Sequence, residues 1–237
     1  MNVGEHKAIP KPPPEERETR LPIWTSCVFI DWHGVLSEEV FWASILDNDT
    51  HELKGSLGRA VRSLFERERE LVERWMRGAV TMDHVVARLD VGLSRRYRTD
   101  FLVRRLLEDC QSMQPRRSLL EPLLERETET KILRTLATDN MDCFFSGAER
   151  LWKSPKPLFD GVLCSSELGV LKAEDPERFF GGWLEARGLE PADAVLIDDS
   201  SENCLAFERW GGTAVHYSSE ERAVSELRAW LGETPNP

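Results

Sequence analysis

The sequence predicts an α/β protein built on a doubly wound parallel sheet, with a block of helices inserted after the first strand. From residue 117 onward, short apolar runs alternate with amphipathic segments, as strands and helices do along a parallel sheet. Between residues 37 and 114 the apolar residues recur with helical spacing, and no strand-like run interrupts them. The crossovers of such a sheet are right-handed and bring helices to both faces.

The strands are predicted from short apolar runs, several of them rich in β-branched residues. The first run, at residues 27–31, is too short for a helix, ends in a carboxylate and is followed by His33 and Gly34. Four further strands are expected at residues 131–138, 161–164, 194–198 and 213–217.

The helices between these strands follow from amphipathic spacing and from signals at their ends. Pro176 suits a first helical turn, Gly211 with Gly212 supplies a stop, and Ser218 with Glu221 predicts a capping box for the last helix. These helices are expected at residues 119–125, 141–152, after Pro176, at 202–210 and from 219.

The inserted helical block predicts a cap over the edge of the sheet where ligands bind. We expect one helix over residues 57–76, a second over 82–89 capped by Thr81, and a third that begins at Ser94 and reaches Leu107. Because the block follows the first strand, it should lie above the carboxyl ends of the strands. The expected division is a flexible Pro-rich tail (1–22), a core (23–37 and 115–237) and a helical cap (38–114).

The amino-acid composition limits which binding partners and which cellular compartment we expect. The chain has 42 Asp and Glu against 31 Lys and Arg, a formal charge of −11, which argues against a nucleic-acid or membrane partner. Its five cysteines form no CxxC pair and suit a reducing compartment. The sequence shows no signal-peptide core and no apolar run long enough to span a bilayer. We therefore expect a cytoplasmic protein; the oligomeric state is left open.

Chemistry-bearing side chains follow the predicted strands and should meet at one edge of the sheet. A carboxylate there can act as a covalent nucleophile, while a hydroxyl and an ammonium group can hold a developing anion. Further carboxylates suit a hard cation such as Mg²⁺, and without a cation they would repel one another. The residues concerned are Asp31, Thr138, Asp139, Asn140, Lys172, Asp198, Asp199 and Asn203.

Four segments containing these residues resemble the ordered motifs of the haloacid dehalogenase (HAD) superfamily. They are VFIDWHGVL (28–36), LATDN (136–140), ELGVLKAEDPERFF with its Lys172, and VLIDDSSENCLAF (195–207). The resemblance spans about residues 27–217 and implies a Rossmann-like HAD core with an inserted helical cap. The phrase WMRGAVTMDHVVARL in the insertion is similar to the subgroup of the N-terminal phosphatase domain of soluble epoxide hydrolase.

The resemblance implies a hydrolase, most specifically a Mg²⁺-dependent phosphatase acting on a small phosphate monoester. Asp31 would attack the phosphoryl group and become an aspartyl-phosphate. Thr138 and Lys172 would hold the phosphoryl oxygens, with Asp139 beside them in the substrate site. Trp32 could line a pocket for the leaving group or pack between cap and core.

The same resemblance implies a metal site. Asp199 would bind Mg²⁺ beside the Asp31 carboxylate and the main-chain carbonyl of His33. Asp198 would support the water shell of the metal or position Lys172, and Asn203 matches an amide that the family often places next to these acids.

One position departs from the pattern of the family phosphatases. These carry a second Asp two residues after the nucleophile, where it protonates the leaving alcohol, and here that residue is His33. Imidazole is a competent acid and base, so His33 could take over this task. Two alternatives stay open: a metal-independent, dehalogenase-like hydrolase, and a catalytically degenerate domain that only binds a ligand or a protein.

Overall fold

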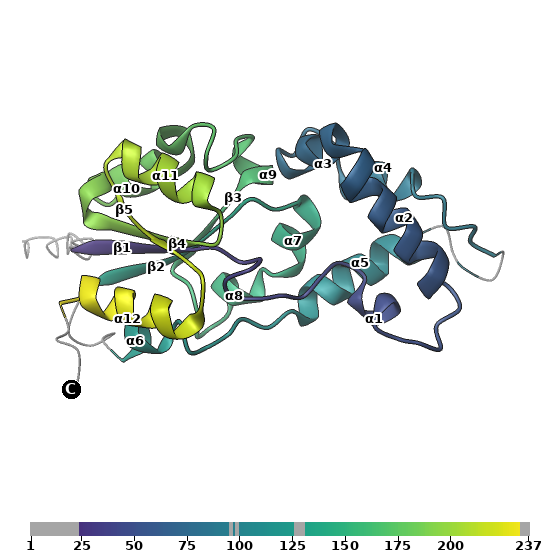
Figure 1. Cartoon of the computed structure of the whole chain (residues 1–237), viewed down its shortest axis with the longest axis horizontal. Helices are drawn as coiled ribbons and strands as arrows, with labels where there is room; N and C mark the ends of the chain where they lie inside the picture. Colours follow the sequence, from purple (N-terminus) through teal and green to yellow (C-terminus); the bar gives the residue numbers. More distant parts are fainter. Residues whose placement is uncertain (1–23, 95–96, 98–99, 126–130, 233–237) are drawn as a thin grey trace, which may run out of the picture.

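The core of the protein is a five-stranded parallel sheet with helices on both faces (Figure 1). The computed structural model describes residues 24–94, 97, 100–125 and 131–232. The predicted tail at residues 1–22 therefore lies outside the described residues. The strands are β1 (Ser26–Ile30), β2 (Ile132–Thr138), β3 (Gly161–Cys164), β4 (Ala194–Asp198) and β5 (Thr213–His216), in the spatial order β3-β2-β1-β4-β5.

The central strand β1 shows why the sheet is doubly wound. Val28 and Ile30 belong to an apolar cluster on one face, whereas Cys27 and Phe29 belong to a separate cluster on the other. Successive strand residues point to opposite faces, so a strand that is apolar at every position needs cover on both. The predicted α/β class with a parallel sheet is thus confirmed.

Helices and shorter helical turns connect these strands. The core helices are α6 (Glu121–Leu124), α7 (Asp142–Gly147), α8 (Arg150–Lys153), α9 (Ser165–Leu168), α10 (Gly182–Glu185), α11 (Ser201–Trp210) and α12 (Glu220–Trp230). A π-helical turn at Glu177–Gly181 precedes α10, and a 3-10 turn at Pro191–Asp193 precedes β4. Gly211 ends α11 with φ +113°, as the predicted glycine stop requires.

Within its described residues, the insertion at 38–114 supplies five more helices, which lie beyond the carboxyl ends of the strands (Figure 1). These are α1 (Ala43–Leu46), α2 (Lys54–Arg67), α3 (Arg69–Met76), α4 (Met82–Ala87) and α5 (Phe101–Ser112). Thr81 caps α4 as predicted, because its hydroxyl accepts a hydrogen bond from the backbone N–H of His84. Within the described residues, no helix has the length and apolar character that crossing a bilayer would need.

Several hydrogen bonds join the cap to the core, and two of them lie at Trp75 and its neighbour Met76. The indole Nε1 of Trp75, which is fully buried, donates to Asp142 Oδ1 at 2.7 Å. The Ser165 hydroxyl donates to the carbonyl of Met76 at 2.7 Å. Trp75 therefore packs at the joint between the two parts of the molecule.

Several predicted helix boundaries are wrong. The helix expected over 57–76 is interrupted at Glu68, whose backbone is not helical (φ −112°, ψ 46°), and the helix expected over 141–152 divides into α7 and α8. The helix expected from Ser94 begins only at Phe101, because the Ser94 carbonyl accepts from Tyr97 N–H in a local turn.

The predicted capping box of the last helix is also wrong by one residue. Ser219, not Ser218, caps α12, since its hydroxyl accepts from the backbone N–H of Arg222 at 3.3 Å. This register makes Glu221 the second helical residue, so it is not at the third position that a capping box requires.

Candidate active site

Asp31 follows β1 directly, at the carboxyl end of the central strand. Its backbone N–H donates to the carbonyl of Ile197 at 2.9 Å, and this bond ties the residue to the neighbouring strand β4. The residue is 7% exposed. Burial raises the pKa of Asp31 to about 7 despite the adjacent Lys172 ammonium, and the Asp198 carboxylate adds to the rise.

Lys172 lies between two buried carboxylates. Its Nζ is 2.8 Å from Asp31 Oδ1 and 2.5 Å from Asp198 Oδ2, and it donates to the carbonyl of Ala137 at 3.2 Å. The side chain is 1% exposed. Burial by itself lowers the pKa of Lys172, but Asp31 and Asp198 raise it above its ordinary value, so the ammonium stays charged.

Asp198 is the last residue of β4 and is held by several donors besides Lys172. Its Oδ1 accepts from Ser200 N–H at 2.8 Å, and Asn203 Nδ2 lies 3.2 Å from both carboxylate oxygens. Asn203 is oriented by α11, which begins at Ser201 with Ser200 as its cap. Of the two roles expected for Asp198, this geometry matches the positioning of Lys172.

Three carboxylates form a donor set that fits a hard cation. One carboxylate oxygen each from Asp31, Asp198 and Asp199 lies within 4.8 Å of the other two. Magnesium prefers such oxygen ligands. Burial and the neighbouring Asp198 raise the pKa of Asp199. Because Asp198 already accepts hydrogen bonds on both oxygens, Asp31 and Asp199 are the more available ligands.

Gly34 allows the Asp199 carboxylate to approach the loop after β1. Its φ is +81°, and a Cβ built at this position would lie 2.2 Å from Asp199 Oδ2. A side chain at position 34 would therefore displace a member of the donor set, which gives a physical reason for glycine here.

The loop after β2 brings two more predicted residues to the same edge. Thr138 ends the strand and is buried. Asp139 Oδ1 accepts from the backbone N–H of Lys172 at 3.0 Å, and burial raises the pKa of Asp139. Asn140 is anchored to the start of α9, since its N–H donates to the hydroxyl of Ser165 at 2.9 Å. The four predicted strand ends thus do converge.

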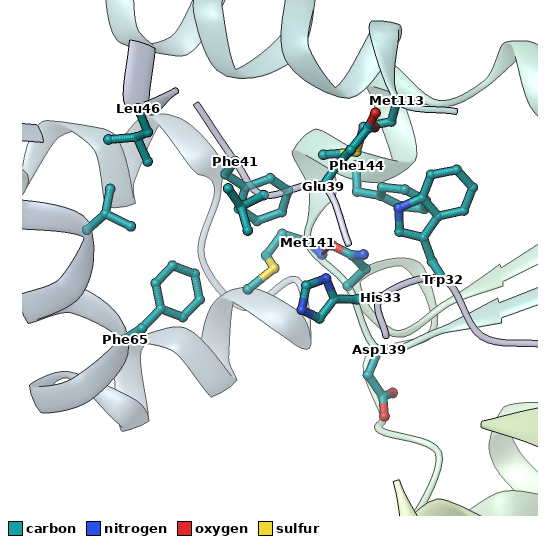
Figure 2. A pocket seen from close by; sticks show the side chains of 13 residues that line it. Trp32, His33, Glu39, Phe41, Leu46, Phe65, Met113, Asp139, Met141 and Phe144 are labelled. Atoms are coloured by element: carbon teal, nitrogen blue, oxygen red, sulfur yellow. Dashed lines mark hydrogen bonds between the residues drawn. The ribbon is translucent and has the colours of Figure 1, made fainter. Parts of the chain in front are cut away.

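A pocket of about 410 Å³ opens beside this network, between the core and the cap (Figure 2). Trp32 is buried, lines the pocket and packs against Phe144 of the core helix α7, with ring centroids 5.1 Å apart. The exposed side chain of His33 also lines the pocket. The full lining comprises Trp32, His33, Glu39, Val40, Phe41, Leu46, Val61, Phe65, Met113, Asp139, Asn140, Met141 and Phe144.

Most of this lining was missed by sequence reasoning. Val61 and Phe65 lie one turn apart on α2, and in the sequence they look like part of the ordinary buried face of an amphipathic helix. A possible signal was Met141, which directly follows the polar Asp139 and Asn140 of a predicted site loop.

Comparisons with known proteins concern the fold. No known protein-family model matches the chain. A HAD-like family hydrolase from Porphyromonas gingivalis superposes with a TM-score of 0.61 at 14% identity, over 90% of this chain and 100% of that chain. A HAD family enzyme from Bacteroides thetaiotaomicron, in complex with magnesium and inorganic phosphate, superposes with a TM-score of 0.56 at 17% identity. The match covers 81% of this chain and 94% of that chain.

A third similar structure is an L-2-haloacid dehalogenase from Xanthobacter autotrophicus with chloropropionic acid covalently bound. Its TM-score is 0.54 at 16% identity, over 90% of this chain and 84% of that chain. At such low identities the similarity is one of architecture, and it agrees with the sheet order and the helical insertion described above. This chain therefore has the haloacid dehalogenase-like fold, a Rossmann-like α/β core with an inserted helical cap.

Proposed function

We propose that this protein is a hydrolase that uses Asp31 as its nucleophile, and specifically a Mg²⁺-dependent phosphatase of small phosphate monoesters. One observation carries the proposal: the buried Asp31 carboxylate lies 2.8 Å from Lys172 Nζ and shares a cluster of carboxylate oxygens with Asp198 and Asp199. Three acids and one ammonium leave an excess of negative charge, so an anionic substrate requires a further cation at this site.

In the proposed reaction Asp31 attacks the phosphorus atom, a P–O bond to its carboxylate forms, and the bond to the ester oxygen breaks. Lys172 and Thr138 hold the phosphoryl oxygens during this exchange. Water then attacks the phosphorus of the aspartyl-phosphate, releases inorganic phosphate and returns the Asp31 carboxylate. Positioning and charge neutralisation dominate this chemistry.

Asp31 and Asp199 would hold the Mg²⁺, together with the main-chain carbonyl of His33. The ion would supply positive charge beside the phosphoryl oxygens. Asp198 keeps Lys172 in place through its bond to Nζ, and Asn203 in turn orients Asp198. The magnesium and phosphate bound to the similar enzyme from Bacteroides thetaiotaomicron support this choice of ion and ligand.

His33 is the proposed acid and base. Its exposed side chain lines the pocket only two residues after Asp31, so it faces the space that a leaving group would occupy. It would give a proton to the departing oxygen and later take one from the attacking water. We expect His33→Gln to slow hydrolysis of alkyl phosphates by roughly 10²- to 10⁴-fold. Nitrophenyl phosphate should lose much less, because nitrophenolate leaves without a proton.

The proposal is tested by phosphate release from a panel of small esters with Mg²⁺ and with EDTA, together with intact-mass detection of phosphorylated protein. We expect Mg²⁺-dependent release that Asp31→Asn abolishes. The exposed Asp83→Asn, in the first turn of α4, serves as the matched control and should be fully active. Halide release from haloacids in EDTA would instead support the dehalogenase alternative, and binding without either product would support a binding-only domain.

The pocket favours the phosphatase over the haloacid alternative. A haloacid carries a carboxylate, as chloropropionic acid does in the Xanthobacter enzyme. Among the described residues that line the pocket there is no Lys or Arg to hold such a group. The partner we propose is a small molecule, and the location we propose is cytoplasmic, consistent with five free, buried cysteines.

A further inference from the structure

The cap contributes mostly apolar side chains to the pocket beside His33. Four large hydrophobic side chains are exposed in the part of the chain that the structure describes, and two of them, Val40 and Phe65, line this pocket. Their exposed fractions are 47% and 39%. Exposed apolar side chains that gather in one concave site mark a surface that contacts a ligand. In the view of Figure 2 the Met141 side chain lies between those of Phe65 and His33.

Apart from His33, the ionisable groups that line the pocket are carboxylates. Glu39 and Asp139 line it, and the described lining residues include no Lys or Arg. A second phosphate or a carboxylate on the leaving group would therefore meet carboxylates and lose its water without finding a partner. A hydrocarbon group would instead bury its surface against Phe65 and Met141.

We infer that the substrate is a phosphate monoester whose leaving group is apolar and carries no negative charge, such as an alkyl or aryl alcohol. This inference rests on the proposed function and specifies its substrate class. The phosphate would lie at Asp31 and Lys172, and the hydrocarbon would extend past His33 toward Phe65 of the cap. A volume of about 410 Å³ accommodates a medium alkyl chain or a bicyclic aromatic group.

A series of linear alkyl phosphates measures the burial of the leaving group. From ethyl through butyl to hexyl phosphate, kcat/KM should rise about fourfold for each added methylene, the factor that corresponds to about 0.8 kcal/mol. Glucose 6-phosphate and 3-phosphoglycerate should be poor substrates, because the first leaving group is polar and the second is anionic. A flat alkyl series, or a preference for 3-phosphoglycerate, would overturn the inference.

Phe65→Lys places a cation in the pocket at a site exposed enough to tolerate it. It should remove the rise of kcat/KM with alkyl chain length and raise the relative rate on 3-phosphoglycerate. Leu205→Lys is the matched control, because Leu205 is also a large exposed hydrophobic residue, on α11, and does not line the pocket. The control should keep the alkyl series unchanged, and equal effects of the two variants would overturn the inference.

Binding of 2-naphthol to the Asp31→Asn protein, measured by calorimetry, separates failure of the inference from failure of the proposed function. We expect saturable binding that Phe65→Lys weakens at least tenfold. Phosphorylation of Asp31 by acetyl phosphate without naphthol binding or chain-length dependence would overturn the inference and leave the phosphatase proposal intact. Naphthol binding without phosphorylation of Asp31 or turnover of any ester would overturn the phosphatase proposal and support the preference of the pocket for apolar groups.

Discussion

Replacing Lys172 with methionine removes the ammonium group between Asp31 and Asp198 and keeps a side chain of similar length. Asp198 is fully buried and Asp31 is 7% exposed, so neither carboxylate can recover its hydration. Removing one partner from a buried ion pair costs about 3–5 kcal/mol. Against a typical free energy of unfolding of about 5–15 kcal/mol, this is a large fraction. We expect Lys172→Met to be folded but strongly destabilised at pH 8 in EDTA.

The stability that Lys172→Met loses should depend on pH in a defined direction. The pKa of Asp31 is about 7 in the folded protein, above its unfolded value of about 3.9. A carboxyl group with a raised folded pKa favours folding when protonated, so its contribution is complete below about pH 4 and is lost as the pH rises through 7. Without Lys172 the pKa of Asp31 rises further. The loss of unfolding free energy caused by Lys172→Met should therefore be larger at pH 8 than at pH 5.

Urea denaturation followed by tryptophan fluorescence, in EDTA at both pH values, measures this free energy. Lys153→Met is the matched control, because Lys153 is 58% exposed and pairs with Glu149 one helical turn away. Such exposed pairs contribute about 0.3–0.5 kcal/mol. A loss below about 1 kcal/mol for Lys172→Met at pH 8, or a larger loss at pH 5, would refute the reasoning from the buried ion pair.

Two other substitutions test the donor set and the joint between cap and core. Gly34→Ala forces the Asp199 carboxylate to move, so calorimetry should show Mg²⁺ binding weakened by roughly 10- to 100-fold. Gly92→Ala is the control, because Gly92 also has a positive φ but a Cβ there would meet nothing within 4 Å. This control variant should bind Mg²⁺ normally. Asp142→Ala leaves the buried indole N–H of Trp75 without its acceptor. Chemical denaturation should show a free energy of unfolding lower by about 1–3 kcal/mol. An unchanged denaturation midpoint would contradict a stabilising role for the hydrogen bond between Trp75 and Asp142.

The strands were the most predictable part of the fold. The run predicted as 194–198 is β4 as observed, and the run predicted as 27–31 is β1 shifted by one residue. Strands buried on both faces need continuous apolar residues, and this local requirement is visible in the sequence. Helix ends were less predictable, because the breaks at Glu68 and between α7 and α8 interrupt amphipathic patterns that continue across them.

The candidate site was predictable as a set of strand ends, and its internal bonding was not. Parallel strands bring their carboxyl ends to one edge, so Asp31, Thr138 and Asp198 had to be neighbours once the sheet was parallel. Whether Asp198 would face a metal or Lys172 depended on side-chain packing, and the structure shows it bonded to the Lys172 ammonium.

The amino-acid sequence by itself determined the parallel sheet, the place of the helical insertion and the identity of the residues at the strand ends, because each depends on short apolar runs and their order. Only the tertiary structure decided which cap residues face the site. Phe65 is 74 residues from Asp139 yet lines the same pocket, since the insertion folds back over the edge of the sheet. Helical periodicity identifies an apolar face, and packing at long range determines what that face meets.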